Sequence, residues 1–330
     1  MKKYIDLHCH LDGSLDIETS FQLAISRGLI SEDTNIEKFQ KMMRVSSDNE
    51  SLEEFLSKFE LPISILQDEE ALSLSTVGVI KKLSEDNIAY AEIRFAPQHH
   101  TRKGLSQEQV VLAVLEGIKR GAEIYEDVKV NLILCMMRND PVDTNPKENI
   151  KTIEIAKDYL ERGVCAVDLA GGEMNNLEEY KEYFEYAKSL EVPYIIHAGE
   201  NPYPNNVDVA INFGAKRIGR GIHAIDDREV LEKLIESKIP IEVCITSNIQ
   251  CKCAPSYEFH PIKELFDKGV KVTINTDNRT LSDTNLEKEI EKAKNYYGFT
   301  LDEIKKMQID AIDSAFLTEK EKAELINKWL

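Results

Sequence analysis

Residues 4–10 read YIDLHCH, a short apolar run that ends in two histidines. Side chains of a β-strand alternate between its two sides, so we expect His8 and His10 on one side, at the C-terminal end of a first strand. Two imidazoles in that arrangement can bind one metal ion, although a single His-x-His pair is a loose signal. The prediction of a metal site at His8 and His10 therefore depends on whether further candidate ligands occur elsewhere in the chain.

Three further strand-like runs are followed by residues that bind metals or move protons. His197 and Glu200 follow one run, His223 follows a second, and Asp277 follows a third. Only 7 histidines occur in the 330 residues, so their recurrence after such runs calls for a chemical reason.

Strand-like and helix-like segments alternate along the chain. The expected strands are rich in Val, Ile and Leu, as in strands buried on both faces, and cover 4–7, 88–95, 128–136, 164–169, 193–197, 217–219, 240–244 and 271–275. The expected helices cover 72–85, 106–125, 147–161, 176–190, 227–236 and 286–297. The alternation predicts an α/β protein with a parallel sheet, and eight units favour a closed (β/α)8 TIM barrel. No Gly-x-Gly-x-x-Gly follows the first strand, which argues against a dinucleotide fold.

We expect residues 1–330 to form a single metal-dependent hydrolase barrel domain with two additions. Residues 14–70 form a helical insertion after the first strand, and 301–329 form extra C-terminal helices. Within the insertion, apolar residues have helical spacing at Leu52, Phe55, Leu56 and Phe59. They either pack in the core or belong to a lid, because insertions after barrel strands lie on the active-site face.

The overall charge and the cysteines limit the partners and the compartment. Lys and Arg number 41 against 59 Asp and Glu, a net charge of −18 that repels nucleic acid and anionic membranes. The six cysteines lie mostly in or beside apolar runs, with no Cys-x-x-Cys pair, and are expected to be reduced. No apolar stretch has the length of a signal peptide core or a membrane span, so we expect a cytoplasmic protein.

A barrel of this kind brings its strand ends together on one face. The residues that would then meet are His8, His10, His197, Glu200, His223 and Asp277. Three imidazoles and one carboxylate suit Zn²⁺ with one position left open for water, and His223 is a candidate to orient that water. Such an ion lowers the pKa of bound water to about 7. Glu200 is better placed to transfer protons than to bind the ion, and the set predicts metal-assisted hydrolysis.

Five stretches together resemble the adenosine deaminase family, the adenosine/AMP deaminase branch of the amidohydrolase barrels. They are HCHLDGS at 8–14, DLAGGE at 168–173, HAGE at 197–200, RIGRGIH at 217–223 and NTDN at 275–278. The resemblance implies that one Zn²⁺ per chain is held by His8, His10, His197 and Asp277, and that Asp277 also counts among the catalytic groups. It further implies that Glu200 delivers a proton to purine N1 and that His223 steers the attacking hydroxide.

The same resemblance implies a set of substrate contacts. The backbone of Gly171 would meet purine N3, Asp12 would bind the ribose 5′-hydroxyl, and His10 would face the substrate as well as the metal. Asn278 stands where many members carry a second Asp that contacts purine N7. Because N7 accepts hydrogen bonds and an amide donates them, Asn278 is expected to be a working substitute.

The resemblance implies a zinc-dependent hydrolase that converts adenosine, and 2′-deoxyadenosine, to the inosine products with release of ammonia, a step of purine salvage. Other readings stay open: a deaminase of adenine or of a modified adenosine nucleoside, a different metal hydrolase on the same barrel, or a non-catalytic nucleoside-binding protein. The expected partner is a small purine nucleoside. Neither the oligomeric state nor the native metal follows from the sequence.

Overall fold

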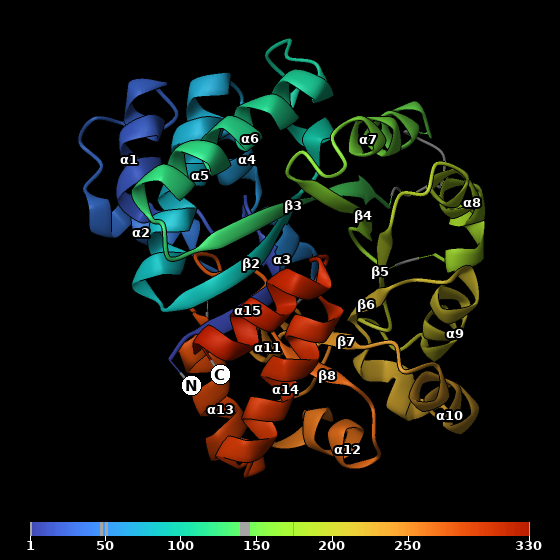
Figure 1. Cartoon of the computed structure of the whole chain (residues 1–330). Coiled ribbons are helices and arrows are strands. Elements are labelled where there is room, and N and C mark those ends of the chain that lie inside the picture. Colours follow the sequence, from blue (N-terminus) through green and yellow to red (C-terminus); the bar gives the residue numbers. More distant parts are fainter. Residues whose placement is uncertain (1, 47–48, 50–51, 139–145, 174, 330) are drawn as a thin grey trace.

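The computed structural model of the chain describes residues 2–46, 49, 52–138, 146–173 and 175–329. Eight parallel strands follow one another around one sheet in the order of the sequence (Figure 1). They are β1 (Tyr4–His10), β2 (Ile88–Phe95), β3 (Lys129–Met137), β4 (Val164–Ala170), β5 (Tyr194–Ala198), β6 (Arg217–Arg220), β7 (Ile241–Val243) and β8 (Val272–Ile274). The predicted α/β barrel is confirmed.

The barrel closes between β1 and the residues that follow β8. The Asp277 N–H donates to the His8 carbonyl at 2.7 Å, and the His10 N–H donates to the Asp277 carbonyl at 2.6 Å. Asp277 adopts a left-handed φ of 60°, which is uncommon for a residue other than glycine. The backbone of this seam therefore holds three of the expected site residues next to one another.

Helices surround the sheet and connect its strands (Figure 1). They are α5 (Glu69–Glu85), α6 (Gln107–Ile124), α7 (Pro146–Asp158), α8 (Lys181–Ser189), α9 (Pro204–Phe213), α10 (Arg228–Ser237), α11 (Ile245–Gln250), α12 (Ile262–Asp267) and α13 (Leu286–Tyr297). Local sequence sets their ends. Ser106 and Gln109 form a capping box at the start of α6, and Gly214 takes a left-handed conformation just after α9.

The insertion after β1 and the C-terminal tail are helical, as predicted. The insertion contains α1 (Ile17–Ser26), α2 (Ile36–Met43), α3 (Leu52–Ser57) and α4 (Glu60–Ile65), and the tail contains α14 (Leu301–Ser314) and α15 (Glu319–Trp329). The tail packs against β1: the buried Gln308 side chain accepts a hydrogen bond from the Ile5 N–H at 2.7 Å. The two ends of the chain lie close together, and the Lys2 N–H donates to the Trp329 carbonyl.

A network of charged side chains fills part of the barrel interior. Arg94 on β2 donates to Asp168 on β4 and to Glu242 on β7, each at 2.9 Å. Arg217 on β6 pairs with Glu242 and with Glu92. All five side chains are completely buried. Buried charges are tolerated when they are paired and hydrogen-bonded, as these are.

In the part of the chain that the structure describes, no helix combines the length and the apolar character needed to cross a bilayer. All six cysteines are buried and free.

Candidate metal and catalytic site

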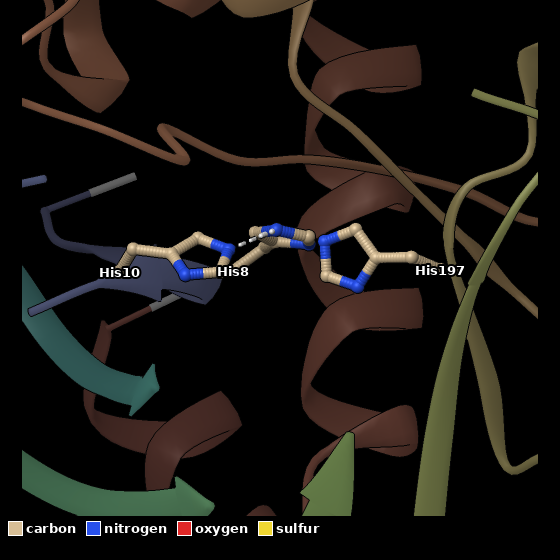
Figure 2. Close-up of side chains that lie close together, drawn as sticks. All are labelled: His8, His10 and His197. Carbon is tan, nitrogen blue, oxygen red and sulfur yellow. Dashed lines mark hydrogen bonds between the residues drawn. The ribbon is translucent and has the colours of Figure 1, made fainter. Parts of the chain in front are cut away.

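Three imidazoles meet at the C-terminal end of the barrel. His8 and His10 come from β1 and His197 from β5, and their rings converge in Figure 2. Ring centroids lie 4.7–5.7 Å apart, and Nε2 of His8 lies 3.3 Å from Nε2 of His10. Strand alternation therefore places His8 and His10 together as the sequence predicted, and β5 adds a third ring 187 positions later in the chain.

Buried carboxylates orient two of these rings. His8 donates through Nδ1 to Glu242 at 2.7 Å, and His197 donates through Nδ1 to Asp168 at 2.9 Å. Each Nδ1 contact leaves the Nε2 lone pair free to bind a metal. Burial alone would raise the pKa of Asp168, but His197 and Arg94 hold it below its usual value. Burial would also raise the pKa of Glu242, but the positive charges of Arg94 and Arg217 outweigh it and hold this pKa well below its usual value.

Asp277 completes the group from the seam of the barrel. Its Oδ1 lies 3.3 Å from Nε2 of His8 and 3.5 Å from Nε2 of His10. This oxygen is buried and has no hydrogen-bond partner among the described residues. The other oxygen, Oδ2, accepts from Arg220 Nη2 at 2.5 Å and from Asn278 Nδ2 at 2.6 Å.

These four side chains fit a divalent metal ion. Two nitrogen ligands of a tetrahedral Zn²⁺, each about 2.1 Å from the metal, lie roughly 3.4 Å apart, close to the separation seen between His8 and His10. Asp277 Oδ1 adds a buried acceptor to which no hydrogen-bond donor is paired among the described residues. A buried carboxylate oxygen without a hydrogen-bond partner beside two imidazoles is stabilised by a cation and destabilised without one. The set is of the kind that holds catalytic zinc.

A cavity of about 350 Å³ opens beside His10. Its volume lies in the range of small-molecule sites. Leu56, Phe59 and Ile63 from the insertion line one part, and Gly171 and Gly172 line another. Two of the apolar residues noted at helical spacing therefore face this cavity, whereas Phe55 is buried in the core. Leu52 lies outside the residues whose side chains the structure describes.

Asp12 and Asn278 each offer an unpaired polar atom at the site. Asp12 lines the cavity, is 5% exposed, and has no partner for Oδ1 among the described residues; burial raises its pKa to about 7. Asn278 is buried, and its Oδ1 is also unpaired in the described structure. A Cβ on Gly13 would lie 1.9 Å from that Oδ1, so the position of Asn278 depends on a glycine at residue 13.

Glu200 lies in the loop that follows β5. The carboxylate of Glu173 accepts hydrogen bonds from the N–H groups of Gly199 and Glu200, at 2.9 and 2.8 Å, and thereby fixes the loop. Glu200 is 6% exposed, and its Oε1 lies 3.2 Å from Arg220 Nη2. Arg220 thus bridges Glu200 and Asp277 with one nitrogen.

The structure does not bring His223 into this group. Its Nδ1 bonds to Asp226 at 2.5 Å, and its Nε2 donates to the Cys253 carbonyl at 3.0 Å. His223 follows β6 by three residues, whereas Arg220 is the last residue of that strand. Sequence reasoning therefore missed Arg220, although its position at a strand end was the signal used for the histidines.

Asp168 and Glu242 were also missed as functional residues. Both lie inside strands, on β4 and β7, where the sequence indicated only a buried apolar run. A charged residue within such a run is the available signal, because an unpaired charge is rarely buried. This signal indicates that Asp168 and Glu242 each have a buried partner, but it does not identify the histidine ring that each carboxylate orients.

The chain resembles known proteins along nearly its whole length. A family model described as adenosine deaminase matches residues 4–329. An adenosine deaminase from Clostridium kluyveri is 39% identical over 98% of this chain and 92% of its own length. Another, from Clostridium acetobutylicum, is 40% identical over 98% of this chain and 96% of its own length.

Solved structures show the same fold. An adenine deaminase from Arthrobacter aurescens superposes with a TM-score of 0.88 at 23% identity, covering 99% of this chain and 98% of its own. An amidohydrolase from Burkholderia ambifaria, solved with bound Zn, superposes with a TM-score of 0.85 at 21% identity, covering 99% of this chain and 89% of its own.

Proposed function

The chain belongs to the adenosine deaminase family, and we propose that His8, His10, His197 and Asp277 hold one zinc ion beside the substrate cavity. The chain is a hydrolase that deaminates adenosine, as its relatives of nearly equal length are. The observation that carries the residue assignment is the unpaired, buried Asp277 Oδ1 facing two imidazole nitrogens. When bound, the ion would supply a water molecule activated at neutral pH.

The protein's own residues then bind and orient the nucleoside. Asp12 would accept a hydrogen bond from the ribose 5′-hydroxyl, since its Oδ1 is buried and unpaired in the described structure. The Asn278 amide has two hydrogens and gives one to Asp277, which leaves one for purine N7. Gly171, with a φ of 99°, would present its backbone to N3 where a side chain would meet Met137 and Arg138.

Glu200 would hold and transfer the proton that goes to purine N1. Attack at C6 breaks the aromaticity of the ring, and protonation of N1 removes the charge that would otherwise develop there. General acid–base help of this kind is typically worth ~10²–10⁴-fold. Arg220 would fix the position of Glu200 relative to Asp277 through its two contacts. We assign to Arg220 the charge-stabilising role for which the sequence suggested His223.

The insertion supports a lid over the cavity. Leu56, Phe59 and Ile63 lie on α3, α4 and the short connection between them, and all three line the cavity wall. We propose that residues 1–330 act as one barrel domain in which the insertion at 14–70 covers the bound nucleoside. The proposed substrates are adenosine and 2′-deoxyadenosine, because the contacts above address the purine and the 5′-hydroxyl and none addresses the 2′-position.

The test uses purified, zinc-loaded protein mixed with adenosine, with inosine followed by the loss of the adenine absorbance band. Glu200→Gln should reduce turnover by at least ~10²-fold while the zinc content per chain stays the same. Exposed Glu236→Gln is the matched control and should change neither quantity. Near-normal turnover in Glu200→Gln would remove the proton-donor role, and absence of zinc from folded wild-type protein would remove the site.

A further inference from the structure

Two thiols meet just past the end of α11, next to the proposed proton donor. Cys251 caps the C-terminus of that helix, and Lys252 then takes a left-handed φ of 62° that turns the chain. The turn brings the Cys253 sulfur to 2.9 Å from that of Cys251. Both side chains are buried, at 3% and 6% exposure. The cysteines therefore form an interior dithiol pair that the deamination reaction does not use.

Glu200 faces this pair. The Cys251 sulfur lies 3.8 Å from Glu200 Oε1, and one ligand atom from each of the three residues lies within 4.8 Å of the others. Among the described residues, the two groups of this kind are this one and the three imidazoles. Arg220 separates them, because its Nη2 contacts both Glu200 and Asp277.

We propose that Cys251, Cys253 and Glu200 form a second cation site that selects thiophilic divalent ions. The ions it would bind are Cd²⁺ and, when in excess, Zn²⁺. Thiolates prefer soft ions, and a carboxylate completes such a set for zinc-like metals. Two thiolates and one carboxylate carry three negative charges, which a divalent ion and Arg220 together neutralise. Burial favours that balance, because an uncompensated charge in the interior is costly.

Occupation of this site would stop deamination. A carboxylate bound to a cation no longer carries the proton that purine N1 requires, so filling the thiol site removes Glu200 from the reaction. This inhibitory effect depends on the proposed function of Glu200. Binding of the cation does not depend on it, so the two can be measured separately.

The experiment adds Cd²⁺ to zinc-loaded protein kept reduced by a reagent without thiols. Thiolate ligation gives a charge-transfer absorption in the ultraviolet that imidazole and carboxylate ligands do not give. We expect this absorption to saturate at one Cd²⁺ per chain, with the original zinc still bound by metal analysis. Adenosine turnover should fall in parallel with the absorption and recover when a chelator removes the Cd²⁺.

The double variant Cys251→Ser, Cys253→Ser should lose the absorption, and its turnover should be insensitive to Cd²⁺ at concentrations that inhibit the wild type. Changes to residues around a metal's ligands lower affinity by ~10–100-fold, and loss of two ligands should exceed that. Cys165→Ala is the matched control: this cysteine is also buried but lies on β4 against Ile133 and Ile195, and its loss should leave the titration unchanged.

The Glu200→Gln variant distinguishes the contribution of the carboxylate to Cd²⁺ binding from that of the two thiols. It should weaken Cd²⁺ binding while the absorption at saturation remains. Equal Cd²⁺ affinity in Glu200→Gln and wild type would overturn the three-residue site, as would thiolate absorption without inhibition of an active enzyme. If Cd²⁺ were bound with loss of zinc and without thiolate absorption, the Cd²⁺ would have replaced zinc at the histidines, and the second site would be refuted. An untreated wild type that fails to deaminate adenosine would contradict the proposed function and leave the absorption test of the second site standing.

Discussion

At the scale of single residues, the site is defined by polar atoms that lack partners in the described structure. Buried donors and acceptors are nearly always paired, so such atoms need an explanation. Oδ1 of Asp277 lies beside the imidazoles of His8 and His10, and Asp12, whose Oδ1 also lacks a partner, lines the cavity. A cation explains the first and a substrate hydroxyl explains the second. Each explanation can be tested by changing one side chain.

Asp12→Ala should raise KM for adenosine by ~10–100-fold, because a hydrogen bond to a charged group contributes ~1.5–3 kcal/mol. The measurement compares adenosine with 5′-deoxyadenosine, which lacks the hydroxyl. The variant should treat both substrates alike, whereas the wild type should favour adenosine. If Asp12→Ala instead raised KM by the same factor for adenosine and for 5′-deoxyadenosine, Asp12 would act on something other than the 5′-hydroxyl.

Asn278→Ala should weaken adenosine binding with little loss of bound metal, because Asn278 donates to Asp277 Oδ2 and does not contact Oδ1. An adenosine analogue with carbon in place of N7 provides the internal control. The wild type should bind it about as weakly as the variant binds adenosine. Parallel loss of zinc and substrate binding would refute the N7 contact.

Arg220→Gln should lower kcat more than it raises KM, since the guanidinium contacts Glu200 and Asp277 and does not line the cavity. Removing one member of a buried charge group typically costs ~3–5 kcal/mol, so folding must be checked alongside the kinetics. Arg220→Lys keeps the charge but has a single terminal nitrogen, and should recover part of kcat. An unchanged kcat in a folded Arg220→Gln protein would remove Arg220 from the site.

At the scale of elements, the tail helix α14 supports the strand that carries two histidines. Gln308 accepts from the Ile5 N–H inside the core. Gln308→Ala should therefore destabilise the fold by ~1–3 kcal/mol, the cost of leaving a buried donor unpaired. Urea unfolding measures this. Lys305→Ala, at an exposed position of the same helix, should change the free energy of unfolding by less than ~0.5 kcal/mol.

Strand positions were the part of the structure that the sequence predicted best. The apolar runs at 88–95 and 217–219 correspond to β2 and β6, and helix 286–297 coincides with α13. Short helices were missed: α11 and α12 have six residues each, which is too short for a 3.6-residue period to be recognised. The insertion gave only amphipathic fragments, because α1, α2 and α4 pack on one another and α1 also packs on α5.

The candidate site was predictable where it depended on strand ends. His8, His10, His197 and Asp277 were found because the ends of parallel strands meet on one face. His223 was also predicted from its position after a strand-like run, but it lies three residues beyond β6, and its ring nitrogens bind Asp226 and the Cys253 carbonyl. Side-chain direction after a strand ends depends on the loop, and no periodic rule supplies it.

At the scale of the whole molecule, two buried histidines make the fold sensitive to acid. Burial lowers the pKa of His100 and of His260 to about 3 in the folded chain. The unfolded chain binds their protons near pH 6.5, so their contribution to stability is present above that pH and is lost as the pH falls toward 3.

We therefore expect the free energy of unfolding to decrease by up to ~1.4 kcal/mol per pH unit for each histidine below pH 6.5. Urea midpoints measured between pH 7 and pH 5 test this. His100→Gln keeps a donor for the Leu66 carbonyl, which His100 Nδ1 contacts at 3.0 Å, and should flatten the slope by one proton. An identical slope in the variant and the wild type would show that His100 is not one of the groups responsible.

The seam between the first strand and the turn after the last one has a consequence for biosynthesis. The Asp277 N–H donates to the His8 carbonyl and the Asp277 carbonyl accepts from the His10 N–H, so the binding geometry cannot form before residue 277 has been synthesised. The complete ligand set is therefore available only late in translation. A nascent chain that stalls just before Asp277 has the three histidines but lacks the carboxylate that completes the ligand set, so metal binding by all four side chains reports that synthesis has passed residue 277.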